Sequence, residues 1–285
     1  MYILPGTAST TVAEDLARQL HQPLSKTTIK RFADTEAYVR VEDNLKGEDV
    51  VIVQTTYPDP HIIELFLLQD AVYDQQPKSI TVISPYFGYS RQDKKFLEGE
   101  AISARAIAQH ICLHADLFIT IDPHKEHILK FFSIPTKSCS ALPVLAEYFK
   151  KKHIDFVLAP DKGALSRAEI VSQILGCQYD YMEKTRIDSH TVTIKTKSLD
   201  VNHKNVVIIN DIISTGGTMI QSVKELKKQG AKDVFVACTH GLFIEDAQHK
   251  LRQAGCKEIV STDTIQSTSS VVKTASCITE FLRQL

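Results

Sequence analysis

Residues 206–218, with the sequence VVIINDIISTGGT, combine an apolar run with side chains suited to a phosphorylated sugar. The run reaches Asn210 and Asp211, and a Ser-Thr-Gly-Gly-Thr turn then opens an amphipathic stretch. Glycines let a backbone approach a ligand closely, and a helix N-terminus offers N–H groups and positive dipole to an anion. A capped strand-to-helix turn would explain a bare glycine pair, but the whole pattern favours phosphate binding, with Asp211 placed for ribose hydroxyls or a metal-bound ligand. The turn residues are Ser214, Thr215, Gly216, Gly217 and Thr218.

A second charged group, Arg91 to Lys95 (RQDKK), follows an apolar run at 79–84. Three cations on a mobile loop can clamp a polyphosphate and then close over it. An ordinary solvated loop would carry the same charge, so charge alone does not decide between these interpretations.

Two further apolar runs are followed by side chains that can bind a metal ion, His124 in IDPH and Asp161 in APDKGA. A lone histidine is more often a hydrogen-bonded structural residue. Mg²⁺, however, usually keeps several waters and takes one or two protein groups together with substrate phosphates. So sparse a ligand set suits Mg²⁺ better than a metal held in a closed protein cage.

Lys184 and Arg186 form a basic pair in the segment EKTR. Two residues apart on an extended chain, they would project to the same face. A surface basic pair is the alternative interpretation, and the spacing alone does not exclude it.

Parallel sheets are the elements that would position these residues. Val- and Ile-rich runs alternate with amphipathic stretches, which predicts an α/β architecture with helices on both sheet faces. Ligands of such sheets lie beyond the carboxyl ends of the strands. The spacing of Thr11 and Glu14 also predicts a capping box at the first helix. The predicted strands are 1–4, 50–54, 79–84, 117–121, 155–159, 205–210, 233–238 and 258–262. The predicted helices are 10–21, 61–75, 101–114, 141–152, 164–175, 217–229, 245–254 and 275–284.

Composition narrows the function classes. The 285 residues include 33 Lys and Arg against 34 Asp and Glu, a net charge of -1. The chain lacks the excess of Lys and Arg that is typical of nucleic-acid-binding proteins, so we expect no nucleic-acid partner. No apolar run approaches the roughly 18 residues that a membrane span requires, and the start lacks the features of a signal peptide. Six widely spaced cysteines predict reduced thiols and a cytoplasmic location.

The order of these motifs resembles the ribose-phosphate pyrophosphokinases, also called phosphoribosyl-pyrophosphate synthetases. The 206–218 loop is similar to one that this family shares with type I phosphoribosyltransferases. YSRQDKK resembles the family signature Y-x-R-Q-D-[RK]-K, which precedes a G-E-x-I-[ST]-A segment. KRFADTE, at 30–36, resembles [KR]-F-x-D-G-E, with Thr35 in place of the usual glycine. The resemblance spans about residues 4–240. Within the family, the chain resembles the shorter archaeal-type branch in its length and in its APDKGAL segment.

The resemblance implies an α/β fold of two phosphoribosyltransferase-type (type I) domains, each a mostly parallel sheet flanked by helices. The expected domains are 1–140 and 141–285, with the active site in the cleft between them. Helix 275–285 is a candidate to return to the first domain. The implied enzyme is a Mg²⁺-dependent transferase (kinase) of nucleotide biosynthesis that acts on ATP and ribose 5-phosphate. It is also expected to be a homo-oligomer, a dimer or higher, because the 30–36 segment of the family reaches a neighbouring subunit's ATP site.

Site roles follow from the resemblance residue by residue. Catalysis is assigned to Lys184 and Arg186, and Mg²⁺ binding to His124 and Asp161. ATP binding is assigned to Phe32, Asp34, Thr35, Glu36, Arg91 and Gln92. Ribose 5-phosphate binding is assigned to Arg186, Asn210, Asp211, Ser214, Thr215, Gly216, Gly217 and Thr218.

Two alternatives remain open at this point. A phosphoribosyltransferase would share the 206–218 loop but would need neither the Arg91–Lys95 loop nor an adenine clamp. A non-catalytic regulatory relative is the other alternative. Asn210 supports it, because the family usually has aspartate there and an amide lacks the negative charge.

Overall fold

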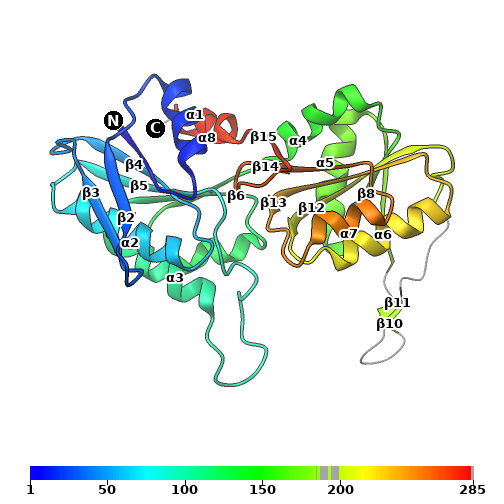
Figure 1. Ribbon diagram of the computed structural model, residues 1–285, viewed down its shortest axis with the longest axis horizontal. Helices are drawn as coiled ribbons and strands as arrows, with labels where there is room; N and C mark the ends of the chain where they lie inside the picture. The colour runs from blue at the N-terminus through cyan, green and yellow to red at the C-terminus, as the bar shows by residue number, and fades with distance from the viewer. Residues whose placement is uncertain (184, 187–191, 194–198, 284–285) are drawn as a thin grey trace. The chain divides into compact units, whose positions relative to one another are not determined.

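The computed structural model describes residues 1–183, 185–186, 192–193 and 199–283 of the chain (Figure 1). Two compact units make up the fold. The first, unit 1, comprises Met1–Ser140 and Thr274–Leu285, and the second, unit 2, comprises Ala141–Lys273. The α/β class predicted from strand–helix alternation is confirmed, because each unit has a parallel sheet with helices on both faces.

Unit 1 is built on a five-stranded parallel sheet with the order β1-β4-β5-β6-β7. Helices α1 and α8 cover one face, and α2 and α3 cover the other (Figure 1). A separate antiparallel hairpin joins β2 and β3. The strands are β1 (Tyr2–Pro5), β2 (Thr27–Arg31), β3 (Ala37–Val41), β4 (Asp49–Val53), β5 (Ser79–Ser84), β6 (Leu117–Ile121) and β7 (Thr136–Cys139). The helices are α1 (Thr10–Leu20), α2 (Pro60–Tyr73), α3 (Ser103–Ile111) and α8 (Ala275–Leu282), with short 3₁₀ turns η1 (Cys112–His114) and η2 (Glu126–Phe131).

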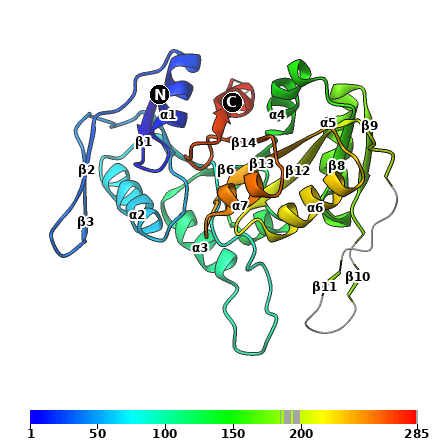
Figure 2. The ribbon, with the colours of Figure 1, turned by 45° about the vertical axis from the view of Figure 1, so that its right-hand side comes forward.

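The last helix, α8, lies beside α1 although the two are at opposite ends of the chain (Figures 1 and 2). The Thr279 hydroxyl donates to Gln19 Oε1 at 3.1 Å, and Arg283 donates to the Gln19 carbonyl oxygen at 3.0 Å. The C-terminal helix therefore completes unit 1.

Unit 2 has a six-stranded parallel sheet with the order β15-β14-β13-β12-β8-β9. Alternate residues of its central strand face opposite layers: Val207 and Ile209 pack with α4 and α5, while Val206 and Ile208 pack with α6 and α7. The strands are β8 (Phe156–Ala159), β9 (Gln178–Tyr181), β12 (Asn205–Ile213), β13 (Asp233–Gly241), β14 (Glu258–Thr262) and β15 (Ser270–Val272), with a separate pair β10 (Thr185–Arg186) and β11 (Val192–Thr193). The helices are α4 (Leu142–Phe149), α5 (Leu165–Leu175), α6 (Gly217–Lys228) and α7 (Ala247–Gln253), with 3₁₀ turns η3 (Lys150–Lys152) and η4 (Lys162–Ala164).

One local prediction is wrong. Helix α1 begins at Thr10 with Ser9 as the N-cap, so the capping box expected at Thr11 and Glu14 is out of position. The Ser9 hydroxyl accepts the Thr55 N–H at 2.8 Å instead, because the chain after β4 brings that donor to the helix start. None of the helices in the described part of the chain combines the length and the apolar character needed to span a bilayer.

A buried carboxylate fixes the loop between β1 and α1. Glu64 of α2 is 2% exposed, and it accepts the Thr7 N–H, the Thr7 hydroxyl and the Gln54 amide, each at 2.7 Å. Burial raises the pKa of Glu64, but hydrogen bonds from His61 and Thr7 outweigh it and hold the pKa below the usual 4.5. The ionised group therefore stabilises the fold above about pH 4.5, and this contribution is lost as the pH falls through the lowered pKa.

Replacing Glu64 by glutamine is expected to lower the free energy of unfolding at pH 7 by about 1–3 kcal/mol, because buried donors lose an ionised acceptor. The difference from the unchanged protein should shrink below pH 4.5, where Glu64 itself begins to protonate. Urea unfolding across this pH range measures it, with Glu14→Gln on the exposed face of α1 as the control. A pH-independent difference would contradict the assignment.

Candidate active site

The predicted phosphate turn joins β12 to α6 in unit 2. Gly216 has a φ of 73°, in the left-handed region that favours glycine, and α6 begins at Gly217. Thr215 and Gly217 are exposed, and Ser214 and Thr218 are half-buried. The first N–H groups of a helix have no carbonyl partner within it. This turn can therefore offer backbone N–H groups and hydroxyls to an anion.

The two polar residues of β12 have different surroundings. The Asn210 amide is half-buried and donates to the Ile212 carbonyl oxygen at 3.1 Å. The neighbouring Asp211 is 3% exposed, and its Oδ1 accepts the Ile212 N–H at 2.9 Å. Its Oδ2 lies 3.1 Å from Nη2 of Arg167 on α5. The carboxylate is thus held from two sides near the turn, rather than projecting freely.

Asp161 follows β8, the strand paired with β12, at the same carboxyl edge of the sheet. Its Oδ1 accepts the Gly163 N–H at 3.0 Å and caps the η4 turn. A carboxylate here is suited to binding Mg²⁺, the metal predicted from the sequence. Within unit 2 the structure therefore brings Asp161, Asn210, Asp211 and the phosphate turn to one edge.

The structure describes little of the predicted catalytic pair. Lys184 lies outside the described residues, and Arg186 belongs to the two-residue strand β10. Their assigned roles remain predictions.

In unit 1, Arg91 and Gln92 open the long loop between β5 and α3, which extends away from the sheet (Figures 1 and 2). Arg91 is exposed, and the Gln92 N–H donates to the Tyr89 carbonyl oxygen at 2.8 Å. The Tyr89 hydroxyl donates to Asp59 at 2.8 Å, and this bond raises the pKa of Tyr89. The start of the loop is therefore braced while Arg91 stays accessible.

His124 follows β6, the strand beside β5, and is half-buried. Three residues later, His127 Nε2 lies 3.1 Å from Asp93 Oδ2, and the Asp93 side chain is only 11% exposed. This contact joins the Arg91–Gly99 loop to the segment that carries His124. Nothing in the sequence pattern pointed to His127.

Replacing His127 by alanine is expected to speed amide hydrogen exchange in residues 91–99 by up to about fivefold, because a partly exposed contact between two polar side chains contributes about 0.2–1 kcal/mol. Exchange followed by mass spectrometry measures it, with His249→Ala, an exposed histidine of α7, as the control. Equal exchange in both variants would show that the contact does not order the loop.

The predicted adenine segment, Phe32–Glu36, is the tip of the β2–β3 hairpin. Phe32 is 48% exposed and stands edge-on to Tyr38, with ring centroids 5.9 Å apart. The Asp34 carboxylate accepts the Glu36 N–H at 3.1 Å, and Thr35 has a φ of 75°. Thr35 therefore adopts the left-handed conformation for which glycine is favoured, and Arg31 donates to its carbonyl oxygen at 3.0 Å.

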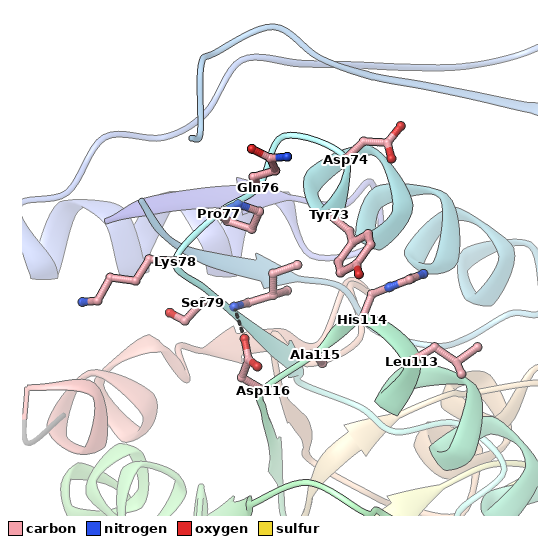
Figure 3. A pocket seen from close by; sticks show the side chains of 11 residues that line it. Tyr73, Asp74, Gln76, Pro77, Lys78, Ser79, Leu113, His114, Ala115 and Asp116 are labelled. Atoms are coloured by element: carbon pink, nitrogen blue, oxygen red, sulfur yellow. Dashed lines mark hydrogen bonds between the residues drawn. The ribbon is translucent and has the colours of Figure 1, made fainter. Parts of the chain in front are cut away.

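A pocket of about 450 Å³ lies at the opposite, amino edge of the unit 1 sheet (Figure 3). The rings of Tyr73 and His114 pack 4.2 Å apart at its wall, and Asp116 accepts the Ile80 N–H at 2.8 Å. None of the predicted site residues that the structure describes lines this pocket, since Arg91 and His124 follow the carboxyl ends of the strands. Within unit 1, the pocket is therefore separate from Arg91 and His124.

The comparisons with known proteins cover almost the whole chain. Residues 1–113 match the family described as the N-terminal domain of ribose phosphate pyrophosphokinase, and residues 144–275 match the phosphoribosyl transferase domain. These matches confirm the predicted pair of phosphoribosyltransferase-type domains.

Curated relatives and a solved structure agree with the family matches. The ribose-phosphate pyrophosphokinase of Sulfurisphaera tokodaii is 41% identical over 95% of this chain and 96% of its own length. The protein of the same name from Methanosarcina acetivorans is 40% identical over 100% of both chains. The crystal structure of phosphoribosylpyrophosphate synthetase from Mycobacterium smegmatis superposes with a TM-score of 0.86 at 28% identity, covering 99% of this chain and 97% of that one. The chain therefore belongs to the ribose-phosphate pyrophosphokinase family.

Proposed function

We propose that this chain transfers the β,γ-diphosphoryl group of ATP to the 1-hydroxyl of ribose 5-phosphate. The products are 5-phospho-α-D-ribose 1-diphosphate and AMP, which supply nucleotide biosynthesis. The observation that carries the proposal is the β12–α6 turn of unit 2, where Gly216 in the left-handed region opens a helix beside a fixed carboxylate.

The turn suits the 5-phosphate, because hydroxyls and backbone N–H groups stand where a helix dipole favours an anion. Asn210 and Asp211 would meet the ribose hydroxyls at the same edge. In unit 1, the exposed Phe32 ring and Arg91 guanidinium suit an adenine and a polyphosphate, respectively. A phosphoribosyltransferase needs neither of these, so unit 1 favours the diphosphokinase.

In the proposed reaction the 1-oxygen of the ribose attacks the β-phosphorus in line. The bond from the β-phosphorus to the oxygen that bridges it to the α-phosphorus breaks, and AMP leaves with that oxygen. The hydroxyl proton passes to solvent. Such transfers depend mainly on positioning and on charge stabilisation. Lys184, Arg186 and Arg91 would supply the positive charge around the transferred group.

His124 and Asp161 are the residues that would hold Mg²⁺, directly or through water. The imidazole and carboxylate each follow a sheet strand and are partly exposed, which fits an ion bound mainly by phosphates and water. When bound, Mg²⁺ would neutralise charge on the polyphosphate. We also propose a homo-oligomer, because the half-exposed Phe32 tip suits an ATP site on a neighbouring subunit.

Isothermal titration tests the substrate assignment. The full-length protein with MgCl₂ should bind ribose 5-phosphate, and separately it should bind ATP. If the protein binds ribose 5-phosphate but does not bind ATP, the phosphoribosyltransferase is favoured instead. Binding of neither ligand by folded protein would contradict the proposal.

A further inference from the structure

Arg167 is the residue whose position suggests a role beyond those already assigned. It lies in the first turn of α5, after the turn that carries Asp161, and its side chain is 19% exposed. Its Nη2 donates to Asp211 Oδ2 at 3.1 Å across 44 residues of chain. The contact therefore joins the β8–α5 turn to the end of β12.

The neighbouring Asn210 does not share this arrangement. Asn210 pairs in register with Cys238, which packs in the core layer of α6 and α7, while Asp211 meets Arg167 of α5. Consecutive strand residues point to opposite faces, so the two side chains reach this edge from opposite sides of the sheet. Asn210 is also uncharged. The charge at this end of β12 therefore comes from Asp211, whose buried side chain is paired with Arg167.

A buried carboxylate that loses one of its hydrogen-bond donors can turn toward other donors. Such a rotation alters what the carboxylate can accept from a ligand. With Arg167 on Oδ2 and the Ile212 N–H on Oδ1, the carboxylate plane is fixed before a ligand arrives. Fixing an acceptor in advance reduces the ordering cost of binding.

We propose that Arg167 is a positioning residue for ribose recognition, which acts by holding the Asp211 carboxylate in one orientation. This inference rests on the proposed function, in which Asp211 meets the ribose hydroxyls. Arg167 itself does not contact the sugar in this arrangement. Its loss should weaken ribose 5-phosphate binding and leave ATP binding unaffected.

Three single variants test the proposal. Arg167→Met removes the charge and keeps much of the aliphatic stem, Arg167→Lys keeps the charge, and Arg252→Met removes an exposed arginine of α7 as the matched control. Titration calorimetry gives the Kd for ribose 5-phosphate and for MgATP, and circular dichroism verifies folding. Arg167→Met should weaken ribose 5-phosphate binding about tenfold, equal to about 1.4 kcal/mol, with MgATP within about twofold. Arg167→Lys should recover most of the loss, and Arg252→Met should bind both ligands normally.

A double-mutant cycle separates positioning from a general structural role. In the Asp211→Asn background, Arg167→Met should cause little further loss of ribose 5-phosphate affinity, because its target is already gone. An equal loss in both backgrounds, or normal affinity in folded Arg167→Met, would overturn the proposal. If Arg167→Met does not fold, Arg167→Gln, which also removes the charge, carries the same cycle. If the unsubstituted protein binds no ribose 5-phosphate, the proposed function fails first, so the two failures are distinguishable.

Discussion

Replacing Lys184 by alanine is expected to lower kcat about 10²–10³-fold, the usual cost of removing one group that stabilises transition-state charge. Transfer of the diphosphoryl group needs little covalent chemistry from the protein, so cations near the group contribute much of the rate acceleration. The Kd for MgATP should stay within about twofold, because a group that acts mainly in the transition state contributes little to ground-state binding. AMP formation under saturating substrates and calorimetric titration of MgATP measure the two quantities.

Lys224→Ala is the matched control, since this lysine is exposed on α6. It should leave kcat and the Kd for MgATP unchanged. Undiminished turnover in Lys184→Ala would refute the catalytic assignment. An equal loss of turnover and ATP affinity would instead make Lys184 an ATP-binding residue.

The second large effect is expected at Gly216. Gly216→Ala should raise the Kd for ribose 5-phosphate at least about tenfold, because a phosphate needs close approach to the backbone at this turn. The added methyl carbon would stand 3.4 Å from the Ala247 Cβ, an ordinary contact. The expected loss therefore arises from the turn's conformation and the ligand's approach, not from a clash within the protein.

Gly176, which caps α5, supplies a closely matched control. Its φ is 69° against 73° for Gly216, and no atom lies within 4 Å of the Cβ that alanine would add. Both alanine variants should lower the free energy of unfolding by about 1–2 kcal/mol, the cost of a left-handed alanine. Only Gly216→Ala should weaken ribose 5-phosphate binding. Equal affinities for ribose 5-phosphate in the two variants would contradict the assignment of phosphate binding to this turn.

The sequence predicts the buried parts of the fold well. Continuous apolar runs such as 205–210 and 233–238 become the central strands β12 and β13, because strands covered on both faces need apolar side chains throughout. The missed strands of the two main sheets, Thr136–Cys139, Gln178–Tyr181 and Ser270–Val272, are edge strands whose side chains are largely polar or partly exposed. Their side chains lack the apolar periodicity on which such predictions depend. The β2–β3 hairpin and the short β10–β11 pair were missed as well.

In the candidate site, the sequence predicts residues placed by a single segment but misses contacts that depend on packing between segments. Motifs within one strand–turn–helix segment, such as 206–218, place their own residues because the local backbone decides the geometry. Asp211 was predicted from its motif, but Arg167 was not, since their contact depends on α5 packing against β12. The contact between Asp93 and His127 likewise depends on how a loop meets the segment after β6.

At Thr35 the residue type alone predicts the wrong backbone conformation. Its side chain departs from the glycine usual in the family motif, which by itself suggests an altered turn. The structure keeps a φ of 75° there, and the Thr35 N–H donates to the Phe32 carbonyl oxygen at 3.0 Å. Hydrogen bonds around the hairpin tip thus hold a conformation that residue type alone disfavours.

The measurement that tests the central claim most directly is AMP formation from ATP and Mg²⁺, with and without ribose 5-phosphate. We expect AMP only when ribose 5-phosphate is present, in equal amount to 5-phospho-α-D-ribose 1-diphosphate. That result would establish the reaction and show that Asn210 supports it. Folded protein that forms no AMP would contradict the account and favour a non-catalytic relative, with Asn210→Asp as the next variant.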